Sequence, residues 1–237
     1  MRPWKTVDRA ATREGVLTLR RRGQDDWVIG IEGRILMTSA AHRSEDALAV
    51  IGCRAIADRV RPRVMLGGLG MGYTLRAALD HLPSGAHVVV AELTPEVAAW
   101  CRGPLAALTG DAVADKRVRI EIDDVARLLA DAPPGRLDAV LLDLYEGPHA
   151  ASQRADDPHY GPAGLARAQA ALAPGGVLAV WSEEPDRPFE ERMAAAGFRL
   201  ERHRAGRGGR HHVVYLGRKA AALPRRRSRT SEASGAA

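Results

Sequence analysis

Cysteine, aromatic side chains and long apolar runs are all scarce in this sequence. Cys53 and Cys101 are its two cysteines, and each lies in an apolar helical pattern. We therefore expect buried free thiols, and neither a disulfide framework nor a cysteine-rich metal site. No apolar run approaches the roughly 18 residues that span a bilayer, and charged residues follow Met1 where a signal peptide would be apolar. These absences predict a cytoplasmic protein with no membrane span and no metal.

The positive charge of the chain is concentrated at its end. The formal net charge is +6 at pH 7, and the residues from Arg218 onward carry most of it, with Glu232 as their one acid. This stretch has no apolar periodicity, so residues 218–237 are expected to form a disordered basic tail. The tail could contact RNA or acidic lipid. The rest of the chain has no basic stripe with interleaved aromatic residues, so nucleic acid is not expected as its partner.

The first 40 residues predict a small unit of β-strands. Residues 16–22, 27–31 and 34–37 have strand patterns, and short polar turns separate them. We expect this antiparallel unit to pack beside a larger sheet or to form the contact of a homodimer. Ser44 is expected to cap the helix that follows, with Glu45 and Asp46 in its first turn.

From residue 63 onward, apolar strands alternate with helical patterns. The predicted strands are 63–66, 86–91, 118–122, 137–142 and 176–182, and the predicted helices are 74–81, 95–108, 125–131 and 162–172. A last helix, 189–196, precedes an antiparallel hairpin of residues 199–204 and 211–216. The fold class is therefore α/β, with a doubly wound, mostly parallel sheet that ends in an antiparallel hairpin.

A glycine-rich turn follows the first of these strands. Gly68, Gly70 and Gly72 allow positive φ and a close approach of the backbone to a ligand, and the next helix begins with free N–H groups. Glu92 ends the second strand, where such folds bind the hydroxyls of a ribose. The turn alone could be only a tight connection, but with Glu92 it indicates a site for a nucleoside.

Two further strands also end in carboxylates. Asp123 and Asp124 follow the third strand, where one of them can accept a hydrogen bond from an adenine amine while the other caps the next helix. We assign the cap to Asp124 and the adenine contact to Asp123. Asp143 and Glu146 follow the fourth strand, where they could hold a cationic substrate and take its proton, or form a solvated loop.

These groups of residues together resemble a known family. The groups are Gly67-Gly68-Leu69-Gly70-Met71-Gly72, Glu92, Asp123-Asp124 and Asp143-x-x-Glu146-x-Pro148. They look like the Rossmann-like fold of class I S-adenosylmethionine-dependent methyltransferases, and more narrowly they resemble the spermidine synthase (polyamine aminopropyltransferase) family. Met37-Thr38-Ser39 and Ser44-Glu45 are similar to that family's entry into its catalytic domain. The resemblance covers about residues 15–217, and divides the chain into an N-terminal extension (1–40), a catalytic domain (41–217) and the tail (218–237).

The resemblance implies a reaction and a role for each residue. The co-substrate would be decarboxylated S-adenosylmethionine or S-adenosylmethionine, and its aminopropyl or methyl group would pass to an amine or another small nucleophile. Asp143 would be the catalytic base that deprotonates this amine. Other residues would bind the two substrates: Gly68, Gly70, Gly72, Glu92, Asp123 and Asp124 the nucleoside, and Tyr145, Glu146 and Tyr160 the amine.

The chain also departs from the family's pattern. The family usually has an Asp at the position of Gly70, and that Asp contacts the aminopropyl end of decarboxylated S-adenosylmethionine. Glu146 replaces a second Asp, and Leu144-Tyr145 replaces two small residues. Aminopropyl transfer in polyamine biosynthesis is therefore the leading prediction. Methyl transfer from S-adenosylmethionine to a small molecule and a catalytically silent scaffold of the same fold are its alternatives.

Overall fold

The computed structural model of the protein describes residues 2–12, 15–145, 147–148, 156–205 and 212–221. Two of the predicted features lie outside these residues. One is Glu146, and the other is most of the predicted basic tail, since residues 222–237 are not described.

The N-terminal residues form a small antiparallel sheet with the strand order β1-β2-β3-β4. Its strands are β1 (Lys5–Thr12), β2 (Gly15–Arg22), β3 (Asp26–Ile31) and β4 (Arg34–Thr38). Glu32 and Gly33 form the turn between β3 and β4, and both have positive φ, as the tightest hairpin turns require. The three predicted strands are confirmed. The pattern did not reveal β1, because this strand is polar and buries only Ala10.

The rest of the chain is built on a seven-stranded sheet with the order β10-β11-β9-β8-β5-β6-β7. Five neighbouring strands are parallel: β5 (Arg63–Gly67), β6 (His87–Glu92), β7 (Val118–Ile122), β8 (Leu137–Leu142) and β9 (Leu172–Ser182). The hairpin of β10 (Phe198–Ala205) and β11 (His212–Lys219) adds two antiparallel strands beside β9. The predicted doubly wound, mostly parallel sheet with a terminal hairpin is confirmed.

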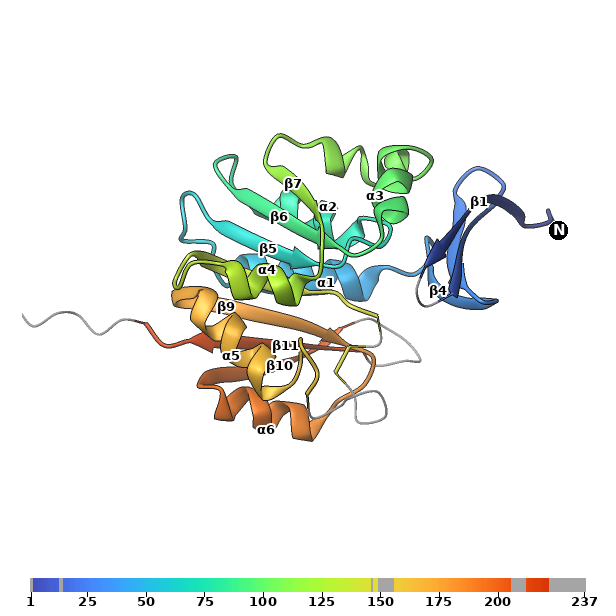
Figure 1. The fold of residues 1–237 in the computed structure, drawn as a ribbon. Coiled ribbons are helices and arrows are strands. Elements are labelled where there is room, and N and C mark those ends of the chain that lie inside the picture. Colours follow the sequence, from blue (N-terminus) through green and yellow to red (C-terminus); the bar gives the residue numbers. More distant parts are fainter. Residues whose placement is uncertain (1, 13–14, 146, 149–155, 206–211, 222–237) are drawn as a thin grey trace, which may run out of the picture.

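Helices cover both faces of this sheet (Figure 1). The helices α1 (Arg43–Arg54), α2 (Tyr73–His81) and α3 (Pro95–Arg102) contribute to one apolar cluster, on what we call the α1 face. The helices α4 (Val125–Asp131), α5 (Pro162–Ala171) and α6 (Arg187–Ala195) contribute to a second cluster on the opposite face. None of the helices in the described part of the chain is long and apolar enough to cross a membrane.

Two predicted helix boundaries are wrong. The helix predicted for residues 95–108 ends at Arg102, because Pro104 lacks an N–H group and disfavours helical geometry at Gly103. Two short 3₁₀ turns, Ala106–Thr109 and Ala112–Ala114, follow it. Ser44 does not cap α1. The N-cap is His42, and the Ser44 hydroxyl donates instead to Glu45 at 2.5 Å.

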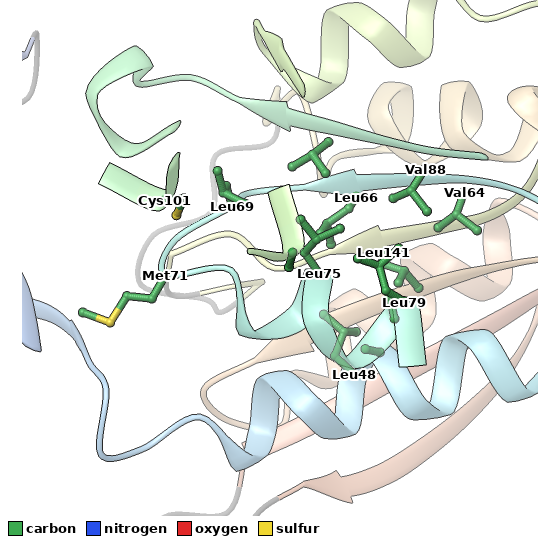
Figure 2. Close-up of a cluster of buried hydrophobic side chains, with 14 of the residues drawn as sticks. Leu48, Val64, Leu66, Leu69, Met71, Leu75, Leu79, Val88, Cys101 and Leu141 are labelled. Atoms are coloured by element: carbon green, nitrogen blue, oxygen red, sulfur yellow. The ribbon is translucent and has the colours of Figure 1, made fainter. Parts of the chain in front are cut away.

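Aliphatic side chains fill the space between the α1 face and its helices (Figure 2). Leu48 of α1 and Leu75 of α2 are fully buried against Leu66 and Leu141 of the sheet. Both cysteines are free and buried, as predicted. Burial raises the pKa of each thiol to about 12, so both stay protonated and behave as small apolar side chains.

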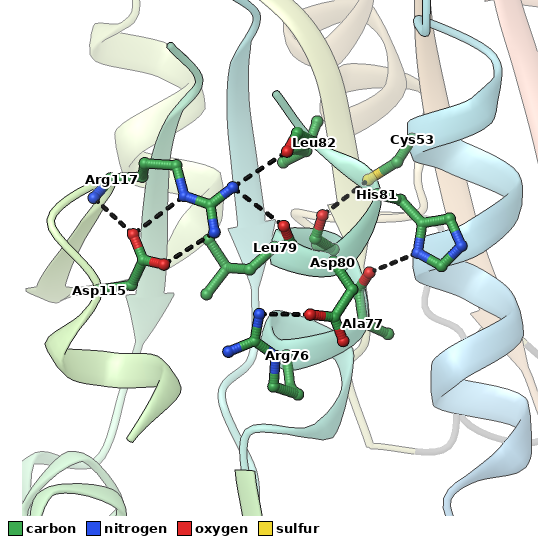
Figure 3. Close-up of polar contacts among 10 residues, drawn as sticks. Cys53, Arg76, Ala77, Leu79, Asp80, His81, Leu82, Asp115 and Arg117 are labelled. Carbon is green, nitrogen blue, oxygen red and sulfur yellow. Dashed lines mark hydrogen bonds and ion pairs between the residues drawn. The ribbon is translucent and has the colours of Figure 1, made fainter. Parts of the chain in front are cut away.

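Arg117, just before β7, ties the sheet to the C-terminal end of α2 (Figure 3). Its guanidinium donates to the carbonyl oxygens of Leu79 (2.9 Å) and Leu82 (3.0 Å), and it also forms an ion pair with Asp115 (2.7 Å). Carbonyl groups at a helix end lack intrahelical partners. Arg117 supplies these partners at the edge of the sheet where the parallel strands begin.

The N-terminal sheet lies at the opposite edge, toward which the parallel strands point (Figure 1). Leu19, Trp27 and Ile29 belong to the same apolar cluster as the side chains of the α1 face. The indole N–H of Trp100 in α3 donates to Asp8 of β1 at 2.7 Å. The small sheet therefore forms one wall of the region where the parallel strands end.

Candidate active site

The carboxyl ends of four adjacent strands bring the predicted residues to one edge of the sheet. The glycine turn follows β5, Glu92 ends β6, Asp123 follows β7 and Asp143 follows β8, and these strands are neighbours in the order β8-β5-β6-β7. Open α/β sheets bind ligands at this edge. The topology therefore places the predicted nucleoside and amine residues side by side, although they are up to 75 positions apart in the sequence.

The glycine turn has the backbone geometry for which glycine is needed. Gly68, Gly70 and Gly72 have φ of +89°, +53° and +85°. A Cβ atom on Gly68 would lie 2.3 Å from the carbonyl oxygen of Asp143, which leaves no room for any side chain there. Gly72 is the N-cap of α2, and no described side chain caps this helix. Its first N–H groups therefore point to the same edge.

Glu92 holds the glycine turn in place. Its carboxylate accepts hydrogen bonds from the backbone N–H of Leu69 (2.9 Å) and of Thr94 (2.8 Å), and its side chain is buried. Burial raises the pKa of Glu92, and the backbone N–H groups oppose that shift. Each carboxylate oxygen has a second lone pair. Glu92 can therefore fix the turn and still accept from ribose hydroxyls.

Asp123 and Asp124 have separate contacts. Asp124 caps α4 by accepting from the N–H of Ala126 at 2.8 Å, as predicted, and it also contacts His159 Nε2 at 2.9 Å. Asp123 pairs with Arg127, and this hydrogen bond lowers the pKa of its carboxyl group. Asp123 remains at the strand end, where the predicted adenine contact requires it.

Two apolar residues beside this carboxylate were not predicted from the sequence. Leu93 is 66% exposed and Ile122 is 47% exposed, and they follow or end the paired strands β6 and β7. Exposed aliphatic side chains next to a polar group suit the apolar faces of a base. Their position was a usable signal, because Leu93 directly follows Glu92 and Ile122 directly precedes Asp123.

Asp143 lies where β8 meets the glycine turn. Its backbone N–H donates to Gly67 at 2.9 Å, and its carboxylate accepts from the hydroxyl of Thr74 at the start of α2. Burial raises the pKa of Asp143 to about 7. The negative charge of Glu45 adds to this shift, and the Thr74 hydroxyl opposes it. Asp143 can therefore accept and release a proton near neutral pH.

The start of α1 contributes side chains that the sequence analysis did not assign to the site. Glu45 acts on Asp143 through its charge, as noted above. His42 stacks on Tyr73 with a ring separation of 4.0 Å, and its Nδ1 lies 2.8 Å from Asp46. These residues come from the segment that links the two sheets. The interaction of Glu45 with Asp143 depends on tertiary packing, so no local pattern could have revealed it.

The two tyrosines predicted to bind the amine have different surroundings. Tyr145 is 50% exposed, and the guanidinium of Arg34 in β4 lies 4.9 Å from its ring centre. Tyr160 is buried against Phe189, and its hydroxyl has no hydrogen-bond partner among the described residues. Burial raises the pKa of Tyr160, with contributions from Asp157 and Asp143. Tyr145 is therefore at the surface, whereas Tyr160 is buried in the apolar cluster on the face of the sheet opposite α1.

Comparison with known proteins identifies the fold. No protein-family model matches the sequence, and no curated protein matches it. A crystal structure of spermidine synthase from Thermotoga maritima is 16% identical with a TM-score of 0.73, over 92% of this chain and 74% of that one. A structure of spermidine synthase in complex with the transition-state analogue AdoDATO has the same identity and TM-score, over 92% of this chain and 73% of that one.

A third structure, a probable spermidine synthase from Corynebacterium glutamicum ATCC 13032, is 19% identical with a TM-score of 0.65, over 90% of this chain and 79% of that one. The chain therefore has the fold of the spermidine synthases, a class I methyltransferase-like fold. The fold that the sequence resemblance implied is confirmed.

Proposed function

We propose that the protein is a transferase that moves the aminopropyl group of decarboxylated S-adenosylmethionine to an amine. The observation that carries this proposal is Asp143. It is a partly buried carboxyl group with a pKa raised to about 7, held by Thr74 and directly beside the glycine turn. The likeness to spermidine synthases supports the same reaction class.

Each group at the strand ends has a role in this reaction. The glycine turn, Glu92 and Asp123 hold the nucleoside, and Asp143 receives the amine. An amine is an ammonium ion near neutral pH and must lose a proton before it can attack, and ionised Asp143 takes that proton. The nitrogen lone pair then forms a bond to the carbon next to sulfur. The carbon–sulfur bond breaks, and its electron pair stays on sulfur as a neutral thioether.

Methyl transfer from S-adenosylmethionine is the second candidate, and the surroundings of Gly70 favour it. A Cβ atom on Gly70 would lie 2.9 Å from both the Sδ and the Cε of Met37. The thioether of Met37, which comes from β4, therefore occupies the space of the Asp that the family resemblance implies for the aminopropyl group. A co-substrate tail at this position meets an apolar group in place of a carboxylate.

Product formation tests both candidates. The full chain is incubated with each co-substrate and a panel of amines, and products are identified by mass spectrometry. An aminopropyl adduct supports the first candidate and a methyl adduct the second. In either case Asp143→Asn should lower kcat by about a hundredfold or more, the usual contribution of general base catalysis.

Asp138→Asn is the matched control for this variant. Asp138 begins the same strand, at the opposite edge of the sheet, where it accepts from the N–H of Arg63 at 2.8 Å. Its replacement should leave kcat unchanged. If the co-substrates bind but no group is transferred to any acceptor, the catalytically silent scaffold is correct and both transferase candidates are wrong.

A further inference from the structure

Trp181 is the neighbour of Asp143 on the α1 face of the sheet. Leu142, the last residue of β8, pairs with Val180 of β9 in parallel register, so Asp143, which directly follows β8, continues this register beside Trp181. Leu141 and Ala179, two positions earlier on each strand, both belong to the apolar cluster of the α1 face. Because side chains alternate along a strand, Asp143 and Trp181 leave the sheet on that same face, about 5 Å apart.

The indole nitrogen of Trp181 is buried and has no hydrogen-bond partner among the described residues. The contact in α3 provides a comparison, because there the indole N–H of Trp100 donates to Asp8. A buried indole N–H normally has such a partner, since leaving a donor unpaired costs free energy. An unpaired donor beside Asp143 therefore indicates a group that is bound when the site is filled.

Asp143 and Trp181 form a row across neighbouring strands, and His212 on β11 extends this row by one more strand. Trp181 pairs with Val214 of β11, and His212 lies two positions before Val214 on the same face. The rings of Trp181 and His212 are 5.1 Å apart, and His212 Nδ1 is also buried without a partner in the described part of the chain. His203 on β10 has a third such nitrogen, but Glu201 lies 3.6 Å from it, so we leave His203 out of the site.

The row therefore has two chemically different halves. Asp143, next to Glu45, suits a cation. The Trp181 nitrogen can only donate a hydrogen bond, and His212 can donate a second one. A ligand that satisfies both halves has an ammonium at one end and an acceptor of two hydrogen bonds at the other, one to two strand spacings away, which is about 5 to 10 Å.

We propose that Trp181 and His212 bind a carboxylate of the acceptor substrate while Asp143 holds its amine. The acceptor is then an amino acid with an amine at the end of its side chain, and not a simple diamine. This assignment rests on the proposed transferase function, since it names the substrate class of the same site. It goes further, because it depends on two residues that the transfer reaction itself does not require.

Two pairs of small molecules test this proposal directly. Ornithine differs from putrescine, and lysine from cadaverine, only by a carboxylate. Calorimetric titration of the full chain, with and without methylthioadenosine, should show that the amino acid of each pair binds about tenfold more tightly than the diamine, as hydrogen bonds to a charged group allow.

Variants assign this preference to the two nitrogens. Trp181→Phe and His212→Phe keep an aromatic ring, and each should reduce the preference for the amino acid while leaving the affinities for the diamine and for methylthioadenosine unchanged. Trp27→Phe removes a buried indole from the N-terminal sheet and should leave the preference intact. An effect confined to the amino acid cannot come from a general loss of folding.

Three results would overturn the proposal: diamines that bind as tightly as the amino acids, a preference that both variants retain, or no binding of any of the four amines. Each of these is distinct from a failure of the proposed transferase function. That function fails when neither the co-substrates nor methylthioadenosine binds, or when no group is transferred to any acceptor.

Discussion

Ionised Asp143 is disfavoured in the folded protein, since its pKa rises from the ordinary value of 3.8 to about 7. The protonated form folds at no such cost. The contribution of Asp143 to the free energy of unfolding is therefore fully present below about pH 4, and it is lost as the pH rises through 7. A shift of three pKa units corresponds to roughly 4 kcal/mol, as an upper estimate.

Asp143→Asn should for this reason make the protein more stable at pH 8. The gain in the free energy of unfolding should be a few kcal/mol at pH 8 and should nearly vanish near pH 4, as measured by urea denaturation at several pH values. Asp80→Asn is the control, because Asp80 is 56% exposed and its ion pair with Arg76 contributes little. An equal effect of Asp143→Asn at both pH values would contradict this account.

Thr74 sets the pH at which Asp143 works. Its hydroxyl lowers the pKa of Asp143, so Thr74→Val should raise that pKa above 7. Because ionised Asp143 is the base, the acidic limb of the kcat/KM profile should move to higher pH. Thr74→Ser retains a hydroxyl, so the acidic limb of its kcat/KM profile should stay at the pH of the wild type. A limb that does not move in Thr74→Val would show that another group accepts the proton.

The sequence revealed the residues of the site that follow a strand directly. Glu92 and Asp143 each end an apolar run, and this local pattern places them at the ligand-binding edge. Glu45, Trp181 and His212 gave no such signal. Glu45 belongs to a helix start, and its position near Asp143 depends on how α1 packs on the sheet. Trp181 and His212 belong to β9 and β11, and their positions relative to Asp143 depend on the order of the strands.

At the scale of secondary-structure elements, Arg117 connects the edge of the sheet to α2. Arg117→Ala would leave the carbonyl groups of Leu79 and Leu82 without their donor and Asp115 without its counterion. We expect a loss of about 2 kcal/mol in the free energy of unfolding. Binding of methylthioadenosine should not change, because the nucleoside residues lie at the other edge.

Arg119→Ala is the matched control for this prediction. Arg119 lies two positions further along β7, and its side chain is 77% exposed. Its ion pair with Glu121 should contribute little. Equal losses in the two variants, measured by urea denaturation, would mean that the contact between Arg117 and α2 does not stabilise the fold.

The glycine turn requires glycine both for its backbone conformation and for its close packing against β8. Alanine substitutions at Gly135 and at Gly68 distinguish these two requirements. Gly135 has a φ of +69°, and a Cβ atom there would meet nothing within 4 Å. Gly135→Ala should therefore cost only about 1 kcal/mol of backbone strain. Gly68→Ala adds a clash with the backbone of Asp143, so we expect a loss at least twice as large and much weaker nucleoside binding.

Calorimetry and urea denaturation of the two glycine variants check this prediction. If Gly68→Ala and Gly135→Ala are equally stable and Gly68→Ala binds methylthioadenosine normally, the close approach of β8 to the turn is not required.

The errors at this scale have local causes. Strand β1 has a mostly polar sequence, and it forms because β2 offers it a paired edge. The region predicted as a helix over 95–108 has apolar residues on both sides of Gly103-Pro104, but the proline ends the helix there. At α1, the stacking of His42 on Tyr73 accompanies a helix start before Ser44.

At the scale of the whole molecule, the two sheets share one apolar cluster. Side chains of the N-terminal sheet, such as Leu19 and Trp27, are buried with those of the α1 face. We propose that the predicted extension of residues 1–40 unfolds together with residues 41–217, the predicted catalytic domain. Tryptophan fluorescence, which reports on Trp4 and Trp27 in the N-terminal part and on Trp100 and Trp181 in the rest of the chain, and far-UV circular dichroism should then give the same urea midpoint. Separate midpoints would show that the N-terminal sheet is an independent unit.

The alternation of strands and helices was sufficient to predict the fold class, because each element has its own period. The sequence did not reveal how the N-terminal sheet meets the main sheet. Met37 fills the space beside Gly70, and Asp8 pairs with Trp100, across long separations in the sequence. The predicted homodimer and the predicted cytoplasmic location stay predictions.

We propose above all that the carboxyl edge of the parallel sheet binds a sulfonium nucleoside beside Asp143. Calorimetric titration with decarboxylated S-adenosylmethionine, S-adenosylmethionine and methylthioadenosine tests it most directly, on the wild type and on Asp143→Asn. The account predicts saturable binding of one molecule per chain, with methylthioadenosine affinity unchanged in Asp143→Asn. If none of the three nucleosides binds to the wild type, the edge is not a nucleoside site and the account is wrong.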